Sequence, residues 1–499
     1  MFDDRTINVQ AQKRAIRVLG LVLACCLISA VVGVPMVEAA TQKTPPSYNY
    51  SYWNEAVPAP AAYQATEIIT GNTLGTGQLL EPNDLHVTED QTVYILDSGN
   101  HRVIVTDHQF QVLRIVDSFM NDGQVDRFQQ PLGLFVNDEG HLYVADTGNH
   151  RIVQLAPDGS LVQIVDTPES DLLPANFVFQ PARLVVDLAG RIYVMAIGVF
   201  DGFMEFNADG TFTTFIGANR VQVDPIEYIW KRLSTREQRS QMVQFTPTEF
   251  TNLDIDEEGF IYATNGDEWG DNIKKLNAHG TDILRRNGYF SPGGDIVYYI
   301  NDGPPRLIDI DVADREIYSV LDAKQGRIFT YNGDGFLMYV FGGKGNLIGE
   351  FHTPVAIERI GDDFLVLDKA LGEITVFKPT EYGQILNEAV RSYYEGDEER
   401  SSALFRRAAD LNANLEYAYD GIGKSLLRQG EYKEAVHYFR QAMDRLNYSK
   451  AYLLYRKQVM REIFPTMMTC LLIFIVVYFT VRKVVNLRGR KKGVPIEME

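Results

Sequence analysis

The chain has 499 residues, of which 45% are hydrophobic and 23% are charged, so it can bury more than one core and is neither disordered nor collagen-like. Its 47 Lys and Arg against 66 Asp and Glu give a net charge of −19. This charge repels a phosphate backbone, which argues against a general nucleic-acid-binding protein.

The first apolar run, Val18–Val34, follows three basic residues and precedes Val37-Glu38-Ala39, where small residues stand as a signal peptidase requires. We therefore predict that residues 1–39 are a signal peptide cleaved after Ala39. The run is also near the lower length limit for a membrane span, so a retained N-terminal anchor is the alternative. In either case the rest of the chain is exported, beginning with a linker over 40–62.

The second apolar run, Ile463–Val481, contains 19 residues without a charge and predicts a transmembrane helix. Pro465 is expected in its first turn, where a missing N–H costs little. A basic tail over 482–499 follows and is predicted to be cytoplasmic. Basic residues also precede the run, so the orientation depends on the export signal. Together the two runs predict a single-pass membrane protein whose bulk is extracytoplasmic.

The three cysteines lie inside the two apolar runs, at Cys25, Cys26 and Cys470. Residues 40–462 therefore cannot form a disulfide. This region holds 37 basic and 61 acidic residues, a net charge of −24. Such a surface disfavours polyanions and anionic lipid as direct ligands.

An internal repeat dominates the middle of the chain. The stretch Val93–Val103 (VYILDSGNHRV) recurs 49 residues later as Leu142–Ile152 (LYVADTGNHRI). Weaker copies are centred on the position of the tyrosine, giving the series Tyr94, Tyr143, Tyr193, Tyr262, Tyr318 and Leu365. Short alternating strands and Asp/Gly turns make each copy a small antiparallel sheet.

Six sheets at a spacing of about 40 to 50 residues predict a six-bladed β-propeller over 63–378, so the fold class is mainly β. The Asp-x-Gly-Asn-His-Arg segments of the first two copies resemble the NHL repeat family closely. In later copies Ala196, Asn265 and Leu321 replace the aspartate, while Asp368 keeps it. For ring closure we expect the segment 63–70 to pair beside 374–377 and complete the last blade.

The spacing of 69 between the third and fourth copies indicates an insertion, which we place at 219–245 and predict to contain a helix from Pro225 to Phe245. Ser234 and Glu237 have the spacing of a capping box. The insertion is either a lid packed on the propeller or a contact for a partner or ligand.

After the propeller the pattern becomes helical, with a period of 34 residues. Gly396 is matched by Gly430, Phe405 by Phe439 and Ala408 by Ala442. This is the period of tetratricopeptide (TPR) repeats, and residues 385–461 resemble that family. Only two copies fit, and a helix from about Tyr448 to Arg461 is expected to complete the stack.

Candidate chemistry is sparse. His101 and His150 repeat in the first two copies, and we expect the accompanying pairs Asp97–Arg102 and Asp146–Arg151 to tie hairpins instead of forming a site. The predicted channel lining is polar and consists of Asp84, His86, Arg183, Glu249 and Asp254. No His-His-Asp pattern indicates a hydrolytic metal, so we assign no catalytic, cofactor-binding or metal residue and expect no cofactor.

These observations favour a non-enzymatic, membrane-anchored extracytoplasmic scaffold that binds a protein partner or ligand through the propeller face and the TPR-like groove. It could be accessory to an envelope or carbohydrate-transport assembly. The alternative is a metal-dependent hydrolase or lyase, because six-bladed propellers similar to this one include lactonases and lyases with a metal in the channel.

Overall fold

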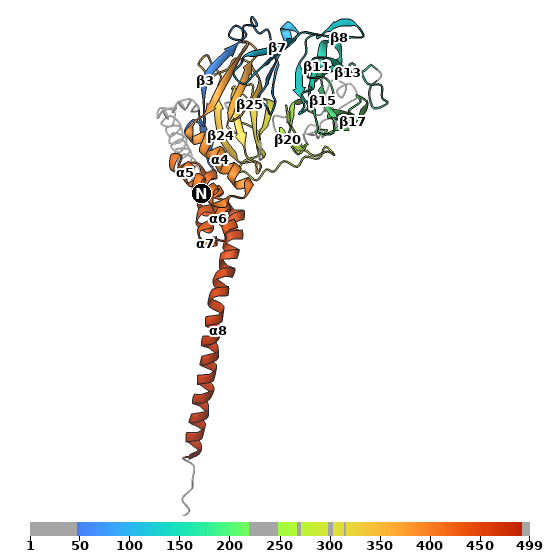
Figure 1. Cartoon of the computed structure of the whole chain (residues 1–499). Coiled ribbons are helices and arrows are strands. Elements are labelled where there is room, and N and C mark those ends of the chain that lie inside the picture. The colour runs from blue at the N-terminus through green and yellow to red at the C-terminus, as the bar shows by residue number, and fades with distance from the viewer. Residues whose placement is uncertain are drawn as a thin grey trace, which may run out of the picture. The chain divides into compact units, whose positions relative to one another are not determined.

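The computed structural model describes residues 47–174, 176–218, 248–266, 271–297, 303–313 and 316–491. Six of its sheets are blades of antiparallel strands, and five helices follow them among the described residues (Figure 1). The chain is therefore mainly β, as predicted. The predicted signal peptide and the insertion 219–245 lie outside the described residues.

The first three blades each contain four strands. Blade one consists of β4 (Asp84–Val87), β5 (Val93–Asp97), β6 (Arg102–Thr106) and β7 (Val112–Val116). A separate hairpin of β8 (Ser118–Asn121) and β9 (Gln124–Arg127) follows it. Blade two consists of β10 (Gly133–Val136), β11 (Leu142–Asp146), β12 (Arg151–Leu155) and β13 (Leu161–Val165). Blade three consists of β14 (Pro181–Val186), β15 (Ile192–Ala196), β16 (Phe203–Phe206) and β17 (Phe212–Ile216).

Blade four has three strands among the described residues, and a single bridge from Leu276 to Asp282 stands where a fourth would run. Its strands are β18 (Phe250–Ile255), β19 (Ile261–Asn265) and β20 (Ile273–Leu276). Blade five consists of β21 (Leu307–Ala313), β22 (Ile317–Asp322), β23 (Arg327–Tyr331) and β24 (Leu337–Gly342). Blade six consists of β25 (Pro354–Ile360), β26 (Asp363–Asp368), β27 (Glu373–Pro379) and β3 (Tyr63–Thr70).

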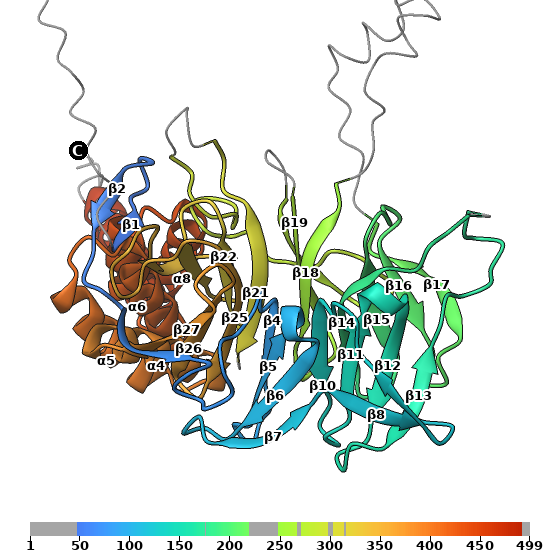
Figure 2. The same ribbon diagram turned by 90° about the horizontal axis from the view of Figure 1, so that it is seen from above.

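The last blade closes the ring with a strand from the start of the propeller. Strand β3 pairs with β27, with Ile69 opposite Ile374 and Ala65 opposite Phe377, which confirms the predicted closure. The innermost strands of successive blades contact each other in the order β4, β10, β14, β18, β21, β25 and back to β4. Figure 2 shows these six strands at the centre of the sheets. Closure removes the open edges that unpaired strands would otherwise expose.

One aspartate position recurs at the end of the second strand of a blade. Asp97 accepts a hydrogen bond from Leu80 N at 2.8 Å, and Asp146 accepts one from Gln129 N at 2.7 Å. The carboxylate thus ties the incoming connection to the blade. Since the carboxylate is fully buried, this backbone donor compensates for its lost hydration.

Blade five keeps this aspartate, which corrects the expectation that Leu321 replaces it. Asp322 pairs with Arg327 in the register in which Asp97 pairs with Arg102, and it accepts a hydrogen bond from Arg306 N at 2.8 Å. The aspartate therefore follows the tyrosine by four residues in blade five, at Tyr318, and by three residues in blades one and two. The spacing between successive tyrosines did not reveal the extra residue, because the loop before the blade also varies in length.

The segment predicted as a linker contains structure. Strands β1 (Tyr48–Tyr50) and β2 (Ala56–Pro58) form a hairpin that packs against β24. Asn49 Nδ2 donates to Met338 O at 3.2 Å, and Tyr48 is fully buried. The run of aromatic residues before Trp53 supplies this packing.

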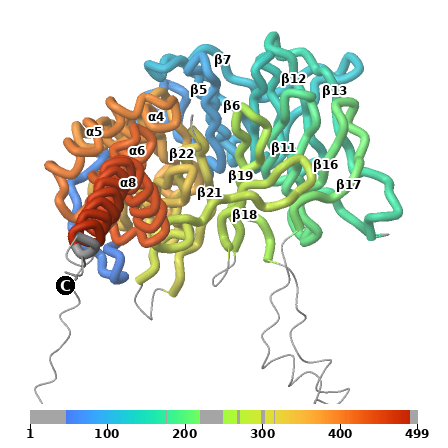
Figure 3. The backbone as a smooth tube through the Cα atoms, turned by 90° about the horizontal axis from the view of Figure 1, so that it is seen from below, coloured from blue at the N-terminus to red at the C-terminus, as the bar shows by residue number. Residues whose placement is uncertain are grey.

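The helices α4 (Glu381–Glu395), α5 (Glu398–Leu411), α6 (Glu416–Gln429) and α7 (Tyr432–Gln441) form two consecutive pairs. Gly396 and Gly430 end the first helix of each pair in the left-handed conformation, which explains the period of 34. A side chain at Gly421 would lie 2.5 Å from the ring of Phe405, so the helices approach closely only because this position is glycine. Figure 3 shows the helices beside blade five.

The final helix, α8 (Arg445–Lys491), is longer than predicted. Its first turns pack on α7 and bury Ala451, as expected for a helix completing the stack. It then continues without a break through the apolar run, so Pro465 lies inside the helix and not in its first turn. The turns before Pro465 belong to the same helix that packs on α7. No helix therefore starts at Ile463, where the predicted transmembrane helix begins. From Arg445 to Arg488, α8 is long and apolar enough to cross a membrane.

A network of alternating charges joins the propeller to α6, and we call it the junction. Lys424 Nζ lies 2.8 Å from Asp334 Oδ2 in blade five and 2.9 Å from Asp420 Oδ2. Arg285 bridges Asp334 and Glu316, at 3.3 Å from each. The propeller and helices therefore share an interface of paired charges.

Candidate functional site in the propeller channel

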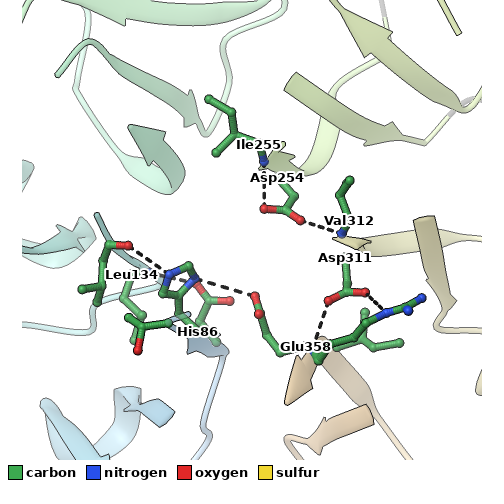
Figure 4. A network of polar contacts seen from close by, with 12 residues as sticks. His86, Leu134, Asp254, Ile255, Asp311, Val312 and Glu358 are labelled. Carbon is green, nitrogen blue, oxygen red and sulfur yellow. Dashed lines mark hydrogen bonds and ion pairs between the residues drawn. The ribbon is translucent and has the colours of Figure 1, made fainter. Parts of the chain in front are cut away.

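The innermost strands carry acidic residues that bind the backbone of the neighbouring blade. Asp84 accepts from Leu134 N at 2.9 Å, which links blades one and two. Asp254 accepts from Val312 N at 2.8 Å, which links blades four and five (Figure 4). Each carboxylate therefore replaces its hydration with a backbone donor.

Strand β21 contributes two such residues toward blade six. Asp309 accepts from Ile357 N at 2.6 Å, and Asp311 accepts from Arg359 N at 3.0 Å. Arg359 Nε also donates to Asp311 at 2.7 Å, so this carboxylate has a charged partner as well. Their even spacing along β21 directs both side chains to the same face of the sheet.

Arg183 on β14 crosses the channel to blade one. Its Nη2 donates to Asn83 O at 2.9 Å, and its Nη1 donates to Leu132 O. Its Nε lies 3.9 Å from Asp84 Oδ1, so the interaction with that carboxylate is weaker than those with the carbonyl groups. The guanidinium thus satisfies backbone acceptors near the centre of the ring.

His86 and Glu358 meet where blades one and six adjoin. His86 Nδ1 lies 3.8 Å from Glu358 Oε1, and its Nε2 lies 3.1 Å from Val136 O (Figure 4). Because a carbonyl only accepts, Nε2 carries the hydrogen and Nδ1 of the neutral ring is an acceptor. The pair therefore couples three blades.

Burial governs the ionisation of these groups. It raises the pKa of Asp254, and the neighbouring Glu358 and Asp311 raise it further. Burial likewise raises the pKa of Asp84, Asp309 and Glu358, and it lowers the pKa of His86. The channel thus favours neutral forms, the pattern expected where acids outnumber cations in a low dielectric.

The channel residues do not fit a metal ion. Among the described residues, no group of three or more His, Cys, Asp or Glu side chains is arranged to hold one. Asp84, Asp254, Asp309 and Asp311 direct oxygens toward backbone N–H groups of adjacent strands, so those oxygens are already engaged.

Four of the five predicted lining residues, Asp84, His86, Arg183 and Asp254, lie on innermost strands. Glu249 does not belong to the lining, because it precedes β18 and is exposed. The sequence reasoning missed four further residues, Asp309, Asp311, Glu358 and Arg359. Glu358 could have been predicted from the repeat, because it lies opposite Leu365 in the strand register just as Asp254 lies opposite Tyr262.

The repeated histidines and ion pairs lie at hairpins, away from the channel-lining positions. Arg102 Nε donates to Asp97 at 2.8 Å and Arg151 Nε donates to Asp146 at 2.9 Å, which confirms their predicted role. His101 adopts a left-handed conformation, and its Nδ1 accepts from Gln130 N at 3.0 Å. These residues fix loop geometry.

The two faces of the propeller are formed by different connections between strands. We call the loop face the one formed by connections between blades and between the second and third strands of each blade. Its exposed apolar side chains include Leu80, Met120, Val125, Leu172, Val178, Ile197, Leu347, Ile348 and Leu371, and it also carries exposed acidic residues such as Glu81, Asp171 and Asp201. The other face, the turn face, carries exposed acidic residues in its tight turns, namely Glu89, Asp90, Asp138, Glu139, Asp158, Asp209, Glu257 and Glu258.

The predicted TPR-like groove is partly covered by the propeller itself. Asn387 of α4 bonds with Tyr339 in blade five at 2.8 Å. Tyr417 of α6 stacks on Phe336 and accepts from Asn332 at 2.9 Å. The first helices of both pairs therefore use their inner side chains for contacts within the chain.

Comparison with known proteins identifies one repeat directly, because residues 128–155 match the NHL repeat. No curated protein sequence matches the chain. The fold is similar to virginiamycin B lyase from Staphylococcus aureus, with 10% identity and a TM-score of 0.39 over 64% of this chain and 100% of that one. A Bacteroides thetaiotaomicron protein of unknown function is similar with 10% identity and a TM-score of 0.40, over 66% of this chain and 74% of that one. Such distant likeness gives no argument about activity.

Proposed function

We propose that this protein is a membrane-anchored extracytoplasmic scaffold whose loop face binds a partner protein. The exposed apolar side chains of the loop face carry the proposal. Apolar side chains exposed to water gain stability when a partner covers them. The engaged carboxylates of the channel support a structural role for the centre of the ring.

In this proposal residues 1–39 direct export, α8 spans the membrane and the tail after it is cytoplasmic. The helices between 385 and 461 act as a TPR-like stack that joins the propeller to α8. Their inner side chains already contact blade five, so we assign partner binding to the loop face in preference to the groove.

Site-specific photo-crosslinking tests the loop face. A photoreactive residue replaces Leu347, which is 72% exposed on the loop face, or Leu188, which is 78% exposed on the turn face. We expect irradiation of intact cells to give a discrete crosslinked species from position 347 and none from position 188. The same products from both positions, or none from either, would reject the proposal.

Cysteine labelling tests the orientation. Cys25, Cys26 and Cys470 are replaced by serine or alanine, and one cysteine is introduced at the exposed Asp158. A membrane-impermeant maleimide should label this variant in intact cells. Labelling only after lysis would place the propeller in the cytoplasm and contradict the extracytoplasmic assignment.

A hydrolase or lyase with its site in the channel is the second candidate. The observation that favours it is the His86–Glu358 pair, because groups with displaced pKa values gather at active sites. A metal-dependent version predicts that the purified full-length chain binds one divalent ion and gains thermal stability from it by linkage. The scaffold proposal predicts no such gain from calcium or zinc.

A further inference from the structure

A small hollow lies where four parts of the chain meet, away from the channel. Its walls come from β1, the segment 289–296, the outer strands of blade five and the start of α6. The aromatic walls are Tyr50, Tyr289, Phe290, Tyr331, Phe336 and Tyr417. The interior admits roughly two groups of the size of a water molecule.

The polar groups of the hollow include two that accept hydrogen bonds strongly. Asn49 is 4% exposed, and its Oδ1 has no hydrogen-bond partner among the described residues. Its Nδ2 is held by Met338 O, which fixes the direction of the amide. An unpaired buried acceptor has lost its hydration without compensation, so this atom gains from a ligand that donates.

Glu416 supplies a carboxylate at the same place. Its Oε2 accepts from Tyr52 N at 2.7 Å, which holds the side chain beside the hairpin. No lysine, arginine or histidine lines the hollow among the described residues, although Lys424 Nζ lies 4.8 Å from the centroid of the Phe336 ring, so that wall already has a cation beside it. The N-terminus of α6 contributes about half a positive charge, which is less than the full negative charge of ionised Glu416.

We propose that this hollow binds a primary alkylammonium group. The ammonium donates to Asn49 Oδ1 and pairs with Glu416, while the aromatic faces attract its charge. The interior holds the ammonium and the methylene next to it, and a bulky quaternary ammonium does not fit. The net charge of −19 raises the local concentration of cations around the protein.

The ammonium group has both hydrogen-bond donors and a positive charge, and together these distinguish it from other ligands that bind between aromatic walls. A neutral alcohol of the same size could donate to Asn49, but it gains nothing from Glu416 or from the charge on the aromatic faces. An anion is repelled by Glu416. The ammonium could belong to a lysine side chain of a protein or to a free amine, and both offer the same chemistry.

The test uses the full-length chain in a non-ionic detergent, with n-propylammonium chloride as the probe and 1-propanol and potassium chloride as controls. We expect the ammonium salt to raise the melting temperature with saturation and to give heat in calorimetric titration. The two controls should have neither effect. An equal response to 1-propanol, or no response to the ammonium, would overturn the proposal.

Two variants locate the effect. Glu416→Gln keeps an acceptor for Tyr52 N and should weaken propylammonium binding about tenfold or more. Phe290→Leu should weaken it severalfold, by loss of one aromatic face. Glu399→Gln is the matched control, because Glu399 is an exposed acid in the first turn of α5, and it should leave binding unchanged. Unchanged binding in Glu416→Gln would reject the site.

A lysine derivative distinguishes the two sources. Nα-acetyl-lysine methylamide that binds about tenfold more tightly than propylammonium identifies a protein side chain as the ligand, and equal affinity identifies a free amine. The Nε-acetylated derivative should not bind in either case. Binding of that neutral derivative would contradict the requirement for charge.

Discussion

The channel and the junction both bury charged side chains, but they compensate them differently. In the channel, carboxylates outnumber cations, and backbone N–H groups of the next blade supply most of the compensation. In the junction, Lys424 and Arg285 alternate with Asp334, Asp420 and Glu316. Burial opposes ionisation of Asp334, but Lys424 and Arg285 together hold its pKa below the ordinary value.

The difference shows what each region depends on. A backbone donor needs only an acceptor oxygen, so the channel retains its links when a carboxyl is protonated. A buried ion pair needs both charges, so the junction fails when one partner is removed. We therefore expect the junction to be sensitive to the loss of charge and the channel to the loss of an acceptor.

The largest effect is expected from Lys424→Met. It leaves Asp334 and Asp420 without their shared cation, and breaking a buried pair in this way costs about 3 to 5 kcal/mol. Denaturant unfolding of the full chain, followed by circular dichroism, measures the change. Lys378→Met is the control, because Lys378 is exposed and lies 3.9 Å from Asp363. Equal losses from the two variants would contradict the assigned pairing.

Asp309→Ala should have the next largest effect. It leaves Ile357 N–H and the amide of Asn252 without their acceptor, and such losses cost about 2 to 3 kcal/mol. The same unfolding experiment measures it. Asp138→Ala, at an exposed turn, should change the unfolding free energy by less than about 0.5 kcal/mol. A loss as small at Asp309 would mean that the link between blades is unimportant.

Asp420 is the exception within the junction, because burial favours its protonated form, as it does for the channel carboxyls. Burial raises the pKa of Asp420 to about 7. An acid with a higher pKa in the folded state binds its proton more tightly there, so stability rises as pH falls through 7 and declines as pH rises. Asp420→Asn should remove about 2 kcal/mol of the gain between pH 8 and pH 5.5. An unchanged profile of melting temperature against pH would show that Asp420 does not titrate in this range.

The smallest effect on stability is expected when glutamine replaces a glutamate, which removes the charge but keeps an acceptor oxygen. The sign of the effect should differ between the channel and the junction. Glu358→Gln should raise stability by up to about 1 kcal/mol at pH 7.5, because burial, Asp311 and Asp84 all disfavour the Glu358 charge. Glu316→Gln in the junction should lower stability by about 1 kcal/mol, because Glu316 binds Lys275 and Arg285. Thermal unfolding of both variants at one pH provides the comparison, and changes of the same sign would remove the distinction.

Much of the fold followed from periodicity. The repeat series predicted six blades, and the apolar segment 63–70 predicted the closing strand, because a propeller blade needs a fourth strand to cover its edge. The hairpin pairs Asp97–Arg102 and Asp146–Arg151 were equally predictable, since the donor and the acceptor of each pair lie within one local turn. Asp322 was missed because its identity depends on strand register.

The channel was only partly predictable. Asp84 and His86 were found because β4 belongs to the best preserved copy. Asp309 and Asp311 were not, because they precede the weaker copy at Tyr318, in which the aspartate is displaced by one residue. Asp84 has an equally distant donor, Leu134, but it stands in a well preserved copy.

The sequence itself determined the order of strands, the helical period and the apolar segment within α8. Each of these corresponds to a repeat or to a continuous run of residues. The junction and the hollow beside Asn49 were decided by tertiary structure. They arise where residues distant in the chain, such as Asp334 and Lys424, meet in an interior from which water is excluded. Whether a buried charge is stable there depends on partners that no local pattern specifies.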